Sequence, residues 1–510
     1  MPTEPRPTPA RQTSLMALVF VGGMSSLGAE IAAARLLAPY FGASTIVWAN
    51  TIAVVLVALS IGYWYGGRLA DRYPRERGLR LAALGAAVLL AAIPFVSGPF
   101  FDVVVGAFDR VDAGAFVGSL FGVLLLLALP LLLLGTITPW ALRLALRGVE
   151  DAGTVAGRLY AISTLGSLAG VFLSALVLIP LVGVQRTFIA FGATLALAAV
   201  SGAAASIPRR ALAVPAVLLA SLALPPGLTK PATDGDRVIA ERETTYQYLR
   251  VVQDGSRRLL ELNEGQAVHS VYDPDSVLTG GVWDGYLSLP LAVLDSPPRT
   301  MAMLGNAAGT VSRAYGKFFP QTRIDGVEID ADVTDVGREL FDLGGNPNLR
   351  TYAQDARPFL RRTKERYDLI GVDAYRQPYI PFYLATREFF DLARSRLTPG
   401  GAVVVNIGHP EGQDALEETI TQGLAAAFGH VARFPIDDQS TLLVASAQRP
   451  DARRLSAAIA SADPELRPLL QRTARELAPA LPNDRRAFTD DRAPVEWLID
   501  SSIVSFAAGE

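Results

Sequence analysis

Long apolar stretches fill residues 14–228, and they constrain the fold more than any other feature of the chain. A helix needs roughly 20 apolar residues to cross the hydrocarbon core of a bilayer. The candidate spans are 14–37, 46–66, 79–98, 115–136, 157–182, 185–206 and 211–228. The last is the weakest, because it contains Pro215 and ends in two further prolines. Residues 14–228 therefore predict a polytopic α-helical membrane domain with six or seven helices.

The chain begins with a polar segment, residues 1–13, that contains four prolines and two arginines. The apolar run that follows is too long for the core of a signal peptide. We therefore predict a disordered tail followed directly by the first membrane span.

The arginines of the membrane half are unevenly distributed. The connection 66–80 holds five and the connection 141–158 holds three, whereas 38–45 and 99–114 carry no net positive charge. Because arginine accumulates in cytoplasmic loops, the N-terminus and the arginine-rich loops are expected in the cytoplasm. Seven crossings would then place the C-terminal half outside the cell, and six would place it inside. Adenosine-based cofactors are made in the cytoplasm, which favours the even number.

Glu30 is an ionisable residue inside the first apolar span. An acid in such a position is a functional candidate, because burying a charge in lipid is costly. The alternative interpretation places Glu30 near the outer interface, where it would pair with Arg35. Both interpretations are open at the level of the sequence.

Charge and composition exclude several classes of site. The net charge is −3, whereas nucleic-acid-binding domains usually present a basic face, so no nucleic-acid partner is expected. The absence of cysteine excludes thiolate metal sites and cysteine nucleophiles. The three histidines are scattered, without the spacing of metal ligands, so no metal site is predicted.

The rest of the chain has the composition of a soluble protein. Residues 229–298 are expected to form a linker and a substrate-binding subdomain, in which 246–252 and 257–263 flank Asp254-Gly255 as a β-hairpin. From 299 to 510, strands and helices alternate. The predicted strands are RTMAML, RIDGVEID, LRTYAQD, YDLIGVD, AVVVNIG, HVARFPI and TLLVASA. This alternation predicts a doubly wound α/β domain, Rossmann-like and of the class I methyltransferase type.

Candidate ligand-binding residues follow the first four of these strands. Such sheets bind ligands beyond the carboxyl ends of their strands, where small residues let a ligand approach the backbone. The candidate cofactor residues are Gly305, Asn306, Ala307 and Gly309 after the first strand, Glu328 and Asp330 after the second, and Asp355 and Ala356 after the third. Asp373 ends the fourth strand and would face the reaction centre. Each acid could instead cap the helix that follows it.

Several blocks, in this order and spacing, resemble the spermidine synthases, specifically the bacterial versions fused to a membrane domain. They are TTYQYLRVV, LNEGQAVHSVY, GVEID, QDAR, YDLIGVDAY, PYIPFYLATREFF and LTPGG, and they cover about a third of the chain. The resemblance implies an integral protein of the bacterial inner membrane. Its activity would be transfer of an aminopropyl group from decarboxylated S-adenosylmethionine to putrescine or a related amine, and a homodimer is a further expectation.

The resemblance also implies roles for individual residues. Glu328 would hold the ribose, Asp355 and Ala356 the adenine, and Asp373 would take a proton from the attacking amine beside Tyr375. Gln247 and Gln266 match glutamines that line the cofactor and amine sites. The remaining candidate substrate residues are Tyr246, Trp283, Asp284, Arg376 and Tyr379. Tyr375, Tyr379 and Tyr383 would either line an amine channel through cation–π contacts or form a packed aromatic lid.

This sequence departs from the family's pattern at three places. The glycine loop LGNAAGT lacks the usual aspartate, Arg376 stands where a second aspartate is usual, and Trp283-Asp284 replaces a Tyr-His pair. A second hypothesis is therefore methyl transfer from, or cleavage of, ordinary S-adenosylmethionine, whose carboxylate Arg376 could meet. A third is a transporter or sensor with a non-catalytic nucleotide-binding domain, since the GGRLADR loop resembles a loop of major-facilitator transporters.

Overall fold

The computed structural model describes residues 9–41, 45–108, 114–146, 148–201, 208–224, 230, 236–263, 267–375, 380–409, 411–481 and 484–499. It divides into two compact units. One comprises Met1–Pro231 and Glu243–Tyr248, and the other comprises Ala232–Arg242 and Leu249–Glu510. Each unit is described by itself below.

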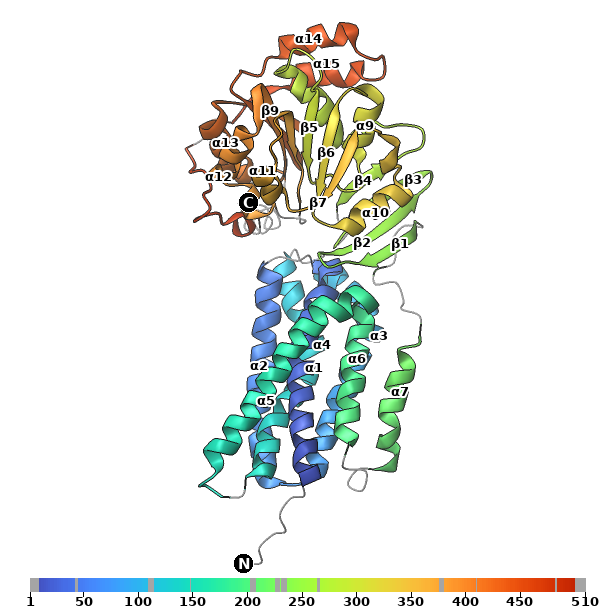
Figure 1. The fold of residues 1–510 in the computed structure, drawn as a ribbon, viewed down its shortest axis with the longest axis vertical. Helices are drawn as coiled ribbons and strands as arrows, with labels where there is room; N and C mark the ends of the chain where they lie inside the picture. The colour runs from blue at the N-terminus through green and yellow to red at the C-terminus, as the bar shows by residue number, and fades with distance from the viewer. Residues whose placement is uncertain are drawn as a thin grey trace, which may run out of the picture. The chain divides into compact units, whose positions relative to one another are not determined.

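The first unit is a helical bundle (Figure 1). Its helices are α1 (Pro9–Phe41), α2 (Thr45–Arg72), α3 (Glu76–Phe108), α4 (Gly114–Ala145), α5 (Ala152–Leu173), a π-helix (Ser174–Leu178), α6 (Ile179–Val200), a 3-10 helix (Arg209–Ala213) and α7 (Val214–Ser221). Five stretches are long and apolar enough to cross a membrane: Gln12–Tyr40, Val47–Arg72, Glu76–Phe101, Ser119–Ala145 and Ala152–Val200. The unit is therefore consistent with an integral membrane protein.

The described residues contain five stretches that could cross a membrane, whereas the sequence predicted six or seven membrane helices. The fifth stretch is 49 residues long, because a π-helix joins α5 to α6 without a gap. Its continuity is broken at Gly183, whose φ of 81° and ψ of 169° are not helical. This kink falls between the predicted spans 157–182 and 185–206. The seventh candidate contains only the eight-residue α7, well short of the roughly 20 residues of a span.

Close backbone contacts and one buried arginine hold the bundle together. A β-carbon on Gly166 or Gly170 of α5 would lie 2.0 or 2.1 Å from a backbone oxygen of α1, so these helices pack through small residues. Arg80 of α3 is fully buried and donates to the carbonyls of Ala199 and Ser201 at 2.8 and 2.7 Å. A fully buried guanidinium stabilises the fold only when its donors are satisfied in this way.

Glu30 and Arg35 of α1 do not form the predicted pair. Arg35 donates to the backbone carbonyl of Thr245. Within the described part of the chain, Glu30 has neither a hydrogen bond nor an ion pair. The two side chains are five positions apart on a helix, whereas neighbours on one face are three or four apart.

The second unit contains two sheets (Figure 1). The smaller has the order β1-β2-β3-β4, with β1 (Arg237–Glu243), β2 (Tyr248–Asp254), β3 (Arg257–Leu262) and β4 (Val268–Tyr272). Strands β2 and β3 form the predicted hairpin, with Asp254 opposite Arg257. The sequence patterns did not reveal β1 and β4.

The larger sheet has the order β12-β10-β11-β9-β8-β5-β6-β7. Its strands are β5 (Thr300–Leu304), β6 (Arg323–Glu328), β7 (Leu349–Ala353), β8 (Tyr367–Val372), β9 (Leu397–Gly408), β10 (His430–Asp437), β11 (Ser440–Ser446) and β12 (Ala478–Pro479). Strands β5 to β9 are parallel, and the rest are antiparallel. All seven predicted strands are present, so the doubly wound, Rossmann-like prediction is confirmed.

Helices cover both faces of this sheet because its strands are apolar on both sides. The helices are α8 (Val282–Ser288), α9 (Thr310–Phe318), α10 (Ala331–Leu340), α11 (Ala356–Arg362), α12 (Arg387–Ser395), α13 (Ala415–Phe428), α14 (Ala452–Ser461) and α15 (Arg467–Glu476). Met301 and Met303 of β5 share a core with α8, α9, α14 and α15. Ala302 and Leu304 point the other way, into a core with α11, α12 and α13.

Candidate functional site

The order in which the chain adds strands to the sheet reverses between β5 and β8. The chain continues from β5 to β6 and β7 on one side and then returns to form β8 and β9 on the other. At such a switch point, the connections diverge and leave a crevice beyond the carboxyl ends of the strands. The backbone N–H of Asp373 donates to Leu304 at 2.8 Å, and that of Gly305 donates to Val327 at 2.9 Å. The ends of β5, β6 and β8 are thus joined by backbone hydrogen bonds at this switch point.

Gly305 opens the turn after β5. Its φ is +86°, and a β-carbon there would lie 2.3 Å from the carbonyl oxygen of Asp373. Glycine is favoured here, because the left-handed conformation is costly for other residues and the close approach leaves no room for a β-carbon. Ala307 and Gly309, with φ of 44° and 93°, continue the turn into α9. The result is a cradle of backbone with almost no side chains, suited to a ligand lying close to the chain.

Glu328 lies beside this cradle, at the end of β6. Its two carboxylate oxygens accept the N–H groups of Ala307 and Asp330, each at 3.1 Å. Burial raises the pKa of Glu328 to about 7, although these hydrogen bonds lower it. Asp330 itself caps α10, accepting from the N–H of Asp332 at 3.1 Å. The helix-cap interpretation therefore holds for Asp330, whereas Glu328 joins the turn after β5 to the start of α10, and its role toward a ligand stays a prediction.

Asp355 follows β7 and also caps a helix. One oxygen accepts the N–H of Arg357 at 2.9 Å, and the other accepts the hydroxyl of Tyr383 at 2.7 Å. Ala356 is the first residue of α11 and is buried. The hydrogen bond from Tyr383 fixes that ring against Asp355, which favours the packed-lid interpretation for this tyrosine.

Asp373 is the acid nearest the switch point. Burial raises its pKa to about 6, while the hydrogen bond from Asn406 Nδ2, at 2.8 Å, lowers it. The hydroxyl of Tyr375 donates to the carbonyl of Asn406 at 2.9 Å and accepts the N–H of Gly408 at 2.6 Å. Tyr375 thus ties the segment after β8 to β9, and burial raises its pKa well above the usual range. A carboxyl with a pKa near neutrality can exchange a proton during a reaction.

Asn406 of β9 is a site residue that sequence reasoning missed. It is the only polar side chain in the apolar strand AVVVNIG, and that contrast was the available signal. Its Oδ1 is buried and has no hydrogen-bond partner. A buried amide oxygen normally has a donor, so this atom, beside Asp373, fits an ammonium or hydroxyl group of a ligand. The observation supports a fit between these residues and an amine substrate.

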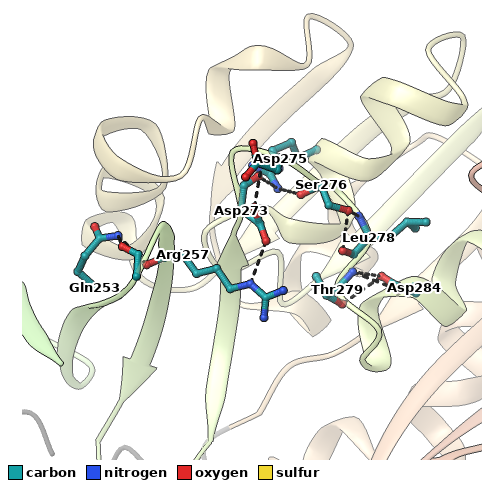
Figure 2. A network of polar contacts seen from close by, with 10 residues as sticks. Gln253, Arg257, Asp273, Asp275, Ser276, Leu278, Thr279 and Asp284 are labelled. Atoms are coloured by element: carbon teal, nitrogen blue, oxygen red, sulfur yellow. Dashed lines mark hydrogen bonds and ion pairs between the residues drawn. The ribbon is translucent and has the colours of Figure 1, made fainter. Parts of the chain in front are cut away.

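Asp284 lies in α8, at the end of a polar network (Figure 2), and Trp283 precedes it in the same helix. Asp284 is buried, and its oxygens accept from Thr279 and from the N–H of Gly280 at 2.8 Å. These bonds hold the loop that leads into α8. Trp283 is partly buried against the core. A substrate role for either residue stays a prediction, and the visible role of Asp284 is structural.

The network in Figure 2 continues toward the small sheet. Arg257 of β3 pairs with Asp273 at 2.9 Å, and the N–H of Asp275 also donates to Asp273. These hydrogen bonds lower the pKa of Asp273, with that from Asp275 contributing most. Together the contacts fix the connection between β4 and α8.

For the remaining predicted residues, the structure does not test a place in this site. Gln266, Arg376 and Tyr379 lie outside the described residues. Tyr246 and Gln247 belong to the segment Glu243–Tyr248, which groups with the membrane-spanning unit. Their roles stay predictions from the resemblance.

One group of potential metal ligands occurs in the described residues of this unit. Side-chain atoms of His409, Asp414 and Glu417 lie within 4.8 Å of one another. Glu417 is fully buried, and its oxygens accept from Arg433 at 2.6 and 2.8 Å. That ion pair already satisfies the carboxylate, so the group is best described as a salt bridge with a neighbouring histidine.

Comparison with known proteins agrees with this geometry. Residues 288–436 match the family model of the spermine/spermidine synthase domain. A probable polyamine aminopropyl transferase of Bifidobacterium longum is 35% identical over 223 residues, which is 44% of this chain and 49% of that protein. A polyamine aminopropyltransferase of Mycobacterium tuberculosis is 27% identical over 377 residues, covering 65% of this chain and 69% of that one.

These matches are partial. The chain spans about half the length of the Bifidobacterium longum relative and 58% of a polyamine aminopropyltransferase of Vibrio vulnificus. Among solved structures, a probable spermidine synthase from Corynebacterium glutamicum aligns with a TM-score of 0.38 and 19% identity, covering 49% of this chain and 98% of that one. Residues 288–436 of this chain are thus similar to the spermine/spermidine synthase domain, and the match covers only part of the chain and of its relatives.

Proposed function

We propose that this chain is a membrane-anchored aminopropyltransferase that uses decarboxylated S-adenosylmethionine and putrescine or a related small amine. The observation that carries the proposal is Asp373, a partly buried carboxyl of raised pKa at the switch point, beside the Gly305 cradle and the unsatisfied Asn406 oxygen. Matches to polyamine aminopropyltransferases support the same reaction class.

The proposed chemistry is a displacement at carbon. The bound cofactor supplies an electrophilic carbon next to a positively charged sulfur. An amine arrives as an ammonium, because its pKa resembles that of lysine, about 10.4, so it must lose a proton before it can attack. Its nitrogen then bonds to the carbon, the carbon–sulfur bond breaks, and sulfur leaves as the neutral thioether of methylthioadenosine. Asp373 would accept the proton, and Asn406 Oδ1 would accept a second N–H and orient the nitrogen.

Residues around the cradle would hold the cofactor. Glu328 is placed for the ribose hydroxyls, and the backbone at Gly305 and Ala307 leaves room for the chain that carries the sulfur. Asp355 and Ala356 would meet the adenine.

The direct test supplies purified protein in detergent with putrescine and either decarboxylated or ordinary S-adenosylmethionine. We expect methylthioadenosine and spermidine, detected by mass spectrometry, only with the decarboxylated cofactor. No turnover of either cofactor with putrescine or other di- and polyamines would contradict the proposal.

One residue of the turn after β5 favours a second candidate reaction, which would use ordinary S-adenosylmethionine. Ala307 occupies the loop where the family usually has an acid, so nothing in the described turn would repel the carboxylate of ordinary S-adenosylmethionine. In the same experiment, S-adenosylhomocysteine would indicate methyl transfer. Methylthioadenosine without spermidine, formed from the ordinary cofactor, would indicate cleavage.

The rate should depend on pH through Asp373. The proton acceptor must be ionised, so kcat/KM should fall as the pH drops through about 6, the raised pKa of this carboxyl. Asn406→Ala removes the hydrogen bond that lowers the pKa, and the acidic limb should therefore move to higher pH. Rate profiles of the two proteins from pH 4.5 to 9 would check this. If the acidic limb of the rate profile lies at the same pH in the variant, Asn406 does not affect the pKa of the titrating group.

We further propose that the protein lies in the bacterial inner membrane with its catalytic domain in the cytoplasm. The kinked fifth stretch counts as two crossings and the short α7 as none, which gives an even number and supports this placement. The hydrogen bond from Arg35, at the end of the first stretch opposite the N-terminus, to Thr245 favours the other side, so labelling must decide between the two. Self-association into a homodimer stays a prediction of the resemblance.

A cysteine experiment tests this orientation, because the chain has no native cysteine. Val149→Cys lies in the arginine-rich connection before α5, and Ser461→Cys ends α14. Both should react with a membrane-impermeant maleimide only after spheroplasts are permeabilised. Labelling of Ser461→Cys alone in intact spheroplasts would place the catalytic domain outside.

A further inference from the structure

Glu30 of α1 is an acid without a partner in a membrane-spanning stretch. It lies within Gln12–Tyr40 and is only partly exposed. No described residue hydrogen-bonds to it or pairs with it, and Arg35 is engaged with the carbonyl of Thr245. A carboxylate in an apolar bundle is costly unless a cation or a proton accompanies it. The described residues of the bundle supply no cation to Glu30. A bound ligand must therefore supply one, or the carboxylate must take up a proton.

A second unsatisfied polar group lies one helical turn earlier. Ser26 is 6% exposed, and its hydroxyl has no hydrogen-bond partner. Residues four apart lie on the same face of a helix, so Ser26 and Glu30 point in the same general direction. The preceding turn identifies that direction, because Gly22 lies against Ile137 of α4 and Gly23 against Ser163 of α5. The two polar groups therefore follow the seam between α4 and α5.

The third observation is the π-helix. Its first residue, Ser174, donates to the carbonyl of Gly28 at 3.0 Å, between Ser26 and Glu30 along α1. A π-helix is a rare interruption of α-helical hydrogen bonding and is often retained at functional sites. Here it lies against the same turn of α1 that carries the two unsatisfied groups.

We propose that Glu30 and Ser26 form an intramembrane binding site for an alkylammonium group. An ammonium offers three donors and a positive charge, which satisfy the carboxylate and the hydroxyl together. A divalent metal fits less well, because calcium takes six to eight oxygen ligands and magnesium an octahedral set. This site is separate from the one at Asp373 and does not rest on the proposed function.

The same ammonium chemistry occurs in soluble diamines and in aminolipid headgroups. Binding of radiolabelled putrescine to the full chain in nanodiscs of phosphatidylglycerol would test the site, and added phosphatidylethanolamine would reveal competition by a lipid. Glu30→Gln removes the charge with little change in size, and Ser26→Ala removes the hydroxyl. Glu150→Gln is the matched control, because the same change lies in the exposed connection before α5.

We expect Glu30→Gln to lose one equivalent of putrescine per chain, and Ser26→Ala to weaken that binding several-fold. Glu150→Gln should bind as the unmodified chain does. Both membrane variants should keep their melting temperature and any release of methylthioadenosine, since Asp373 is untouched. Equal stoichiometry in Glu30→Gln and the unmodified chain would overturn the proposal. A chain that turns over no cofactor but still shows binding dependent on Glu30 would contradict only the proposed function.

Discussion

Replacing Asp373 by asparagine should reduce the release of methylthioadenosine by at least ~10²-fold, the lower end of what a positioned general base contributes. The amide keeps the size of the side chain but cannot take up a proton. Affinity for the cofactor should change only a few-fold, since the cradle at Gly305 and the acid at Glu328 are unaffected. Mass-spectrometric rates and calorimetric binding would measure the two quantities.

The matched control for this substitution is Asp391→Asn. Asp391 lies on α12, is 52% exposed and approaches only Arg387, at 3.7 Å. It should retain full turnover. Undiminished turnover in Asp373→Asn would remove this residue from the mechanism, whereas loss of both turnover and cofactor binding would indicate a structural role.

Gly305→Ala should have the second large effect, on both stability and cofactor binding. A left-handed conformation costs a residue with a β-carbon about 1–2 kcal/mol. The new carbon would also lie 2.3 Å from the carbonyl oxygen of Asp373, so the ends of β5 and β8 would have to separate. We expect the free energy of unfolding to fall by about 2 kcal/mol or more and cofactor affinity to fall more than tenfold.

Gly344→Ala provides the comparison in the same unit. Nothing lies within 4 Å of a β-carbon at that position, and its φ is not positive. Its denaturation midpoint and cofactor affinity should match those of the unmodified chain. If Gly305→Ala behaves like Gly344→Ala, the turn is not the tight cradle described above.

Local patterns were sufficient for seven of the eight strands of the large sheet, but they did not reveal β1 and β4 of the small one. The apolar strands of the large sheet, separated by helices, predicted its parallel core, because a strand buried on both faces must be apolar throughout. The same pattern predicted the edge of the sheet at which a ligand would bind. Gly305, Glu328 and Asp373 each follow a strand, and parallel strands bring their carboxyl ends to one edge.

The sequence did less well where a role depends on residues far apart in the chain. A substrate role for Asp284 stays a prediction, and the sequence did not show that its oxygens accept hydrogen bonds from the loop at Thr279 and Gly280. Asn406 was overlooked, because only pairing of β8 with β9 brings it to Asp373. The expected pair of Glu30 and Arg35 does not form, because a helix directs residues five apart to different faces.

The sequence by itself determined the apolar spans, the order of strands and helices, and the acids at the strand ends, since these depend on local periodicity and turn chemistry. Only the tertiary structure decided that α5 and α6 are joined by a π-helix and kink at Gly183, and that Asp373 meets Asn406. It also showed that Asp330 and Asp355 cap helices, whereas Glu328 accepts the N–H of Ala307 in the turn after β5. The physical reason is that hydrogen bonds and burial depend on neighbours in space, and a linear pattern records only neighbours along the chain.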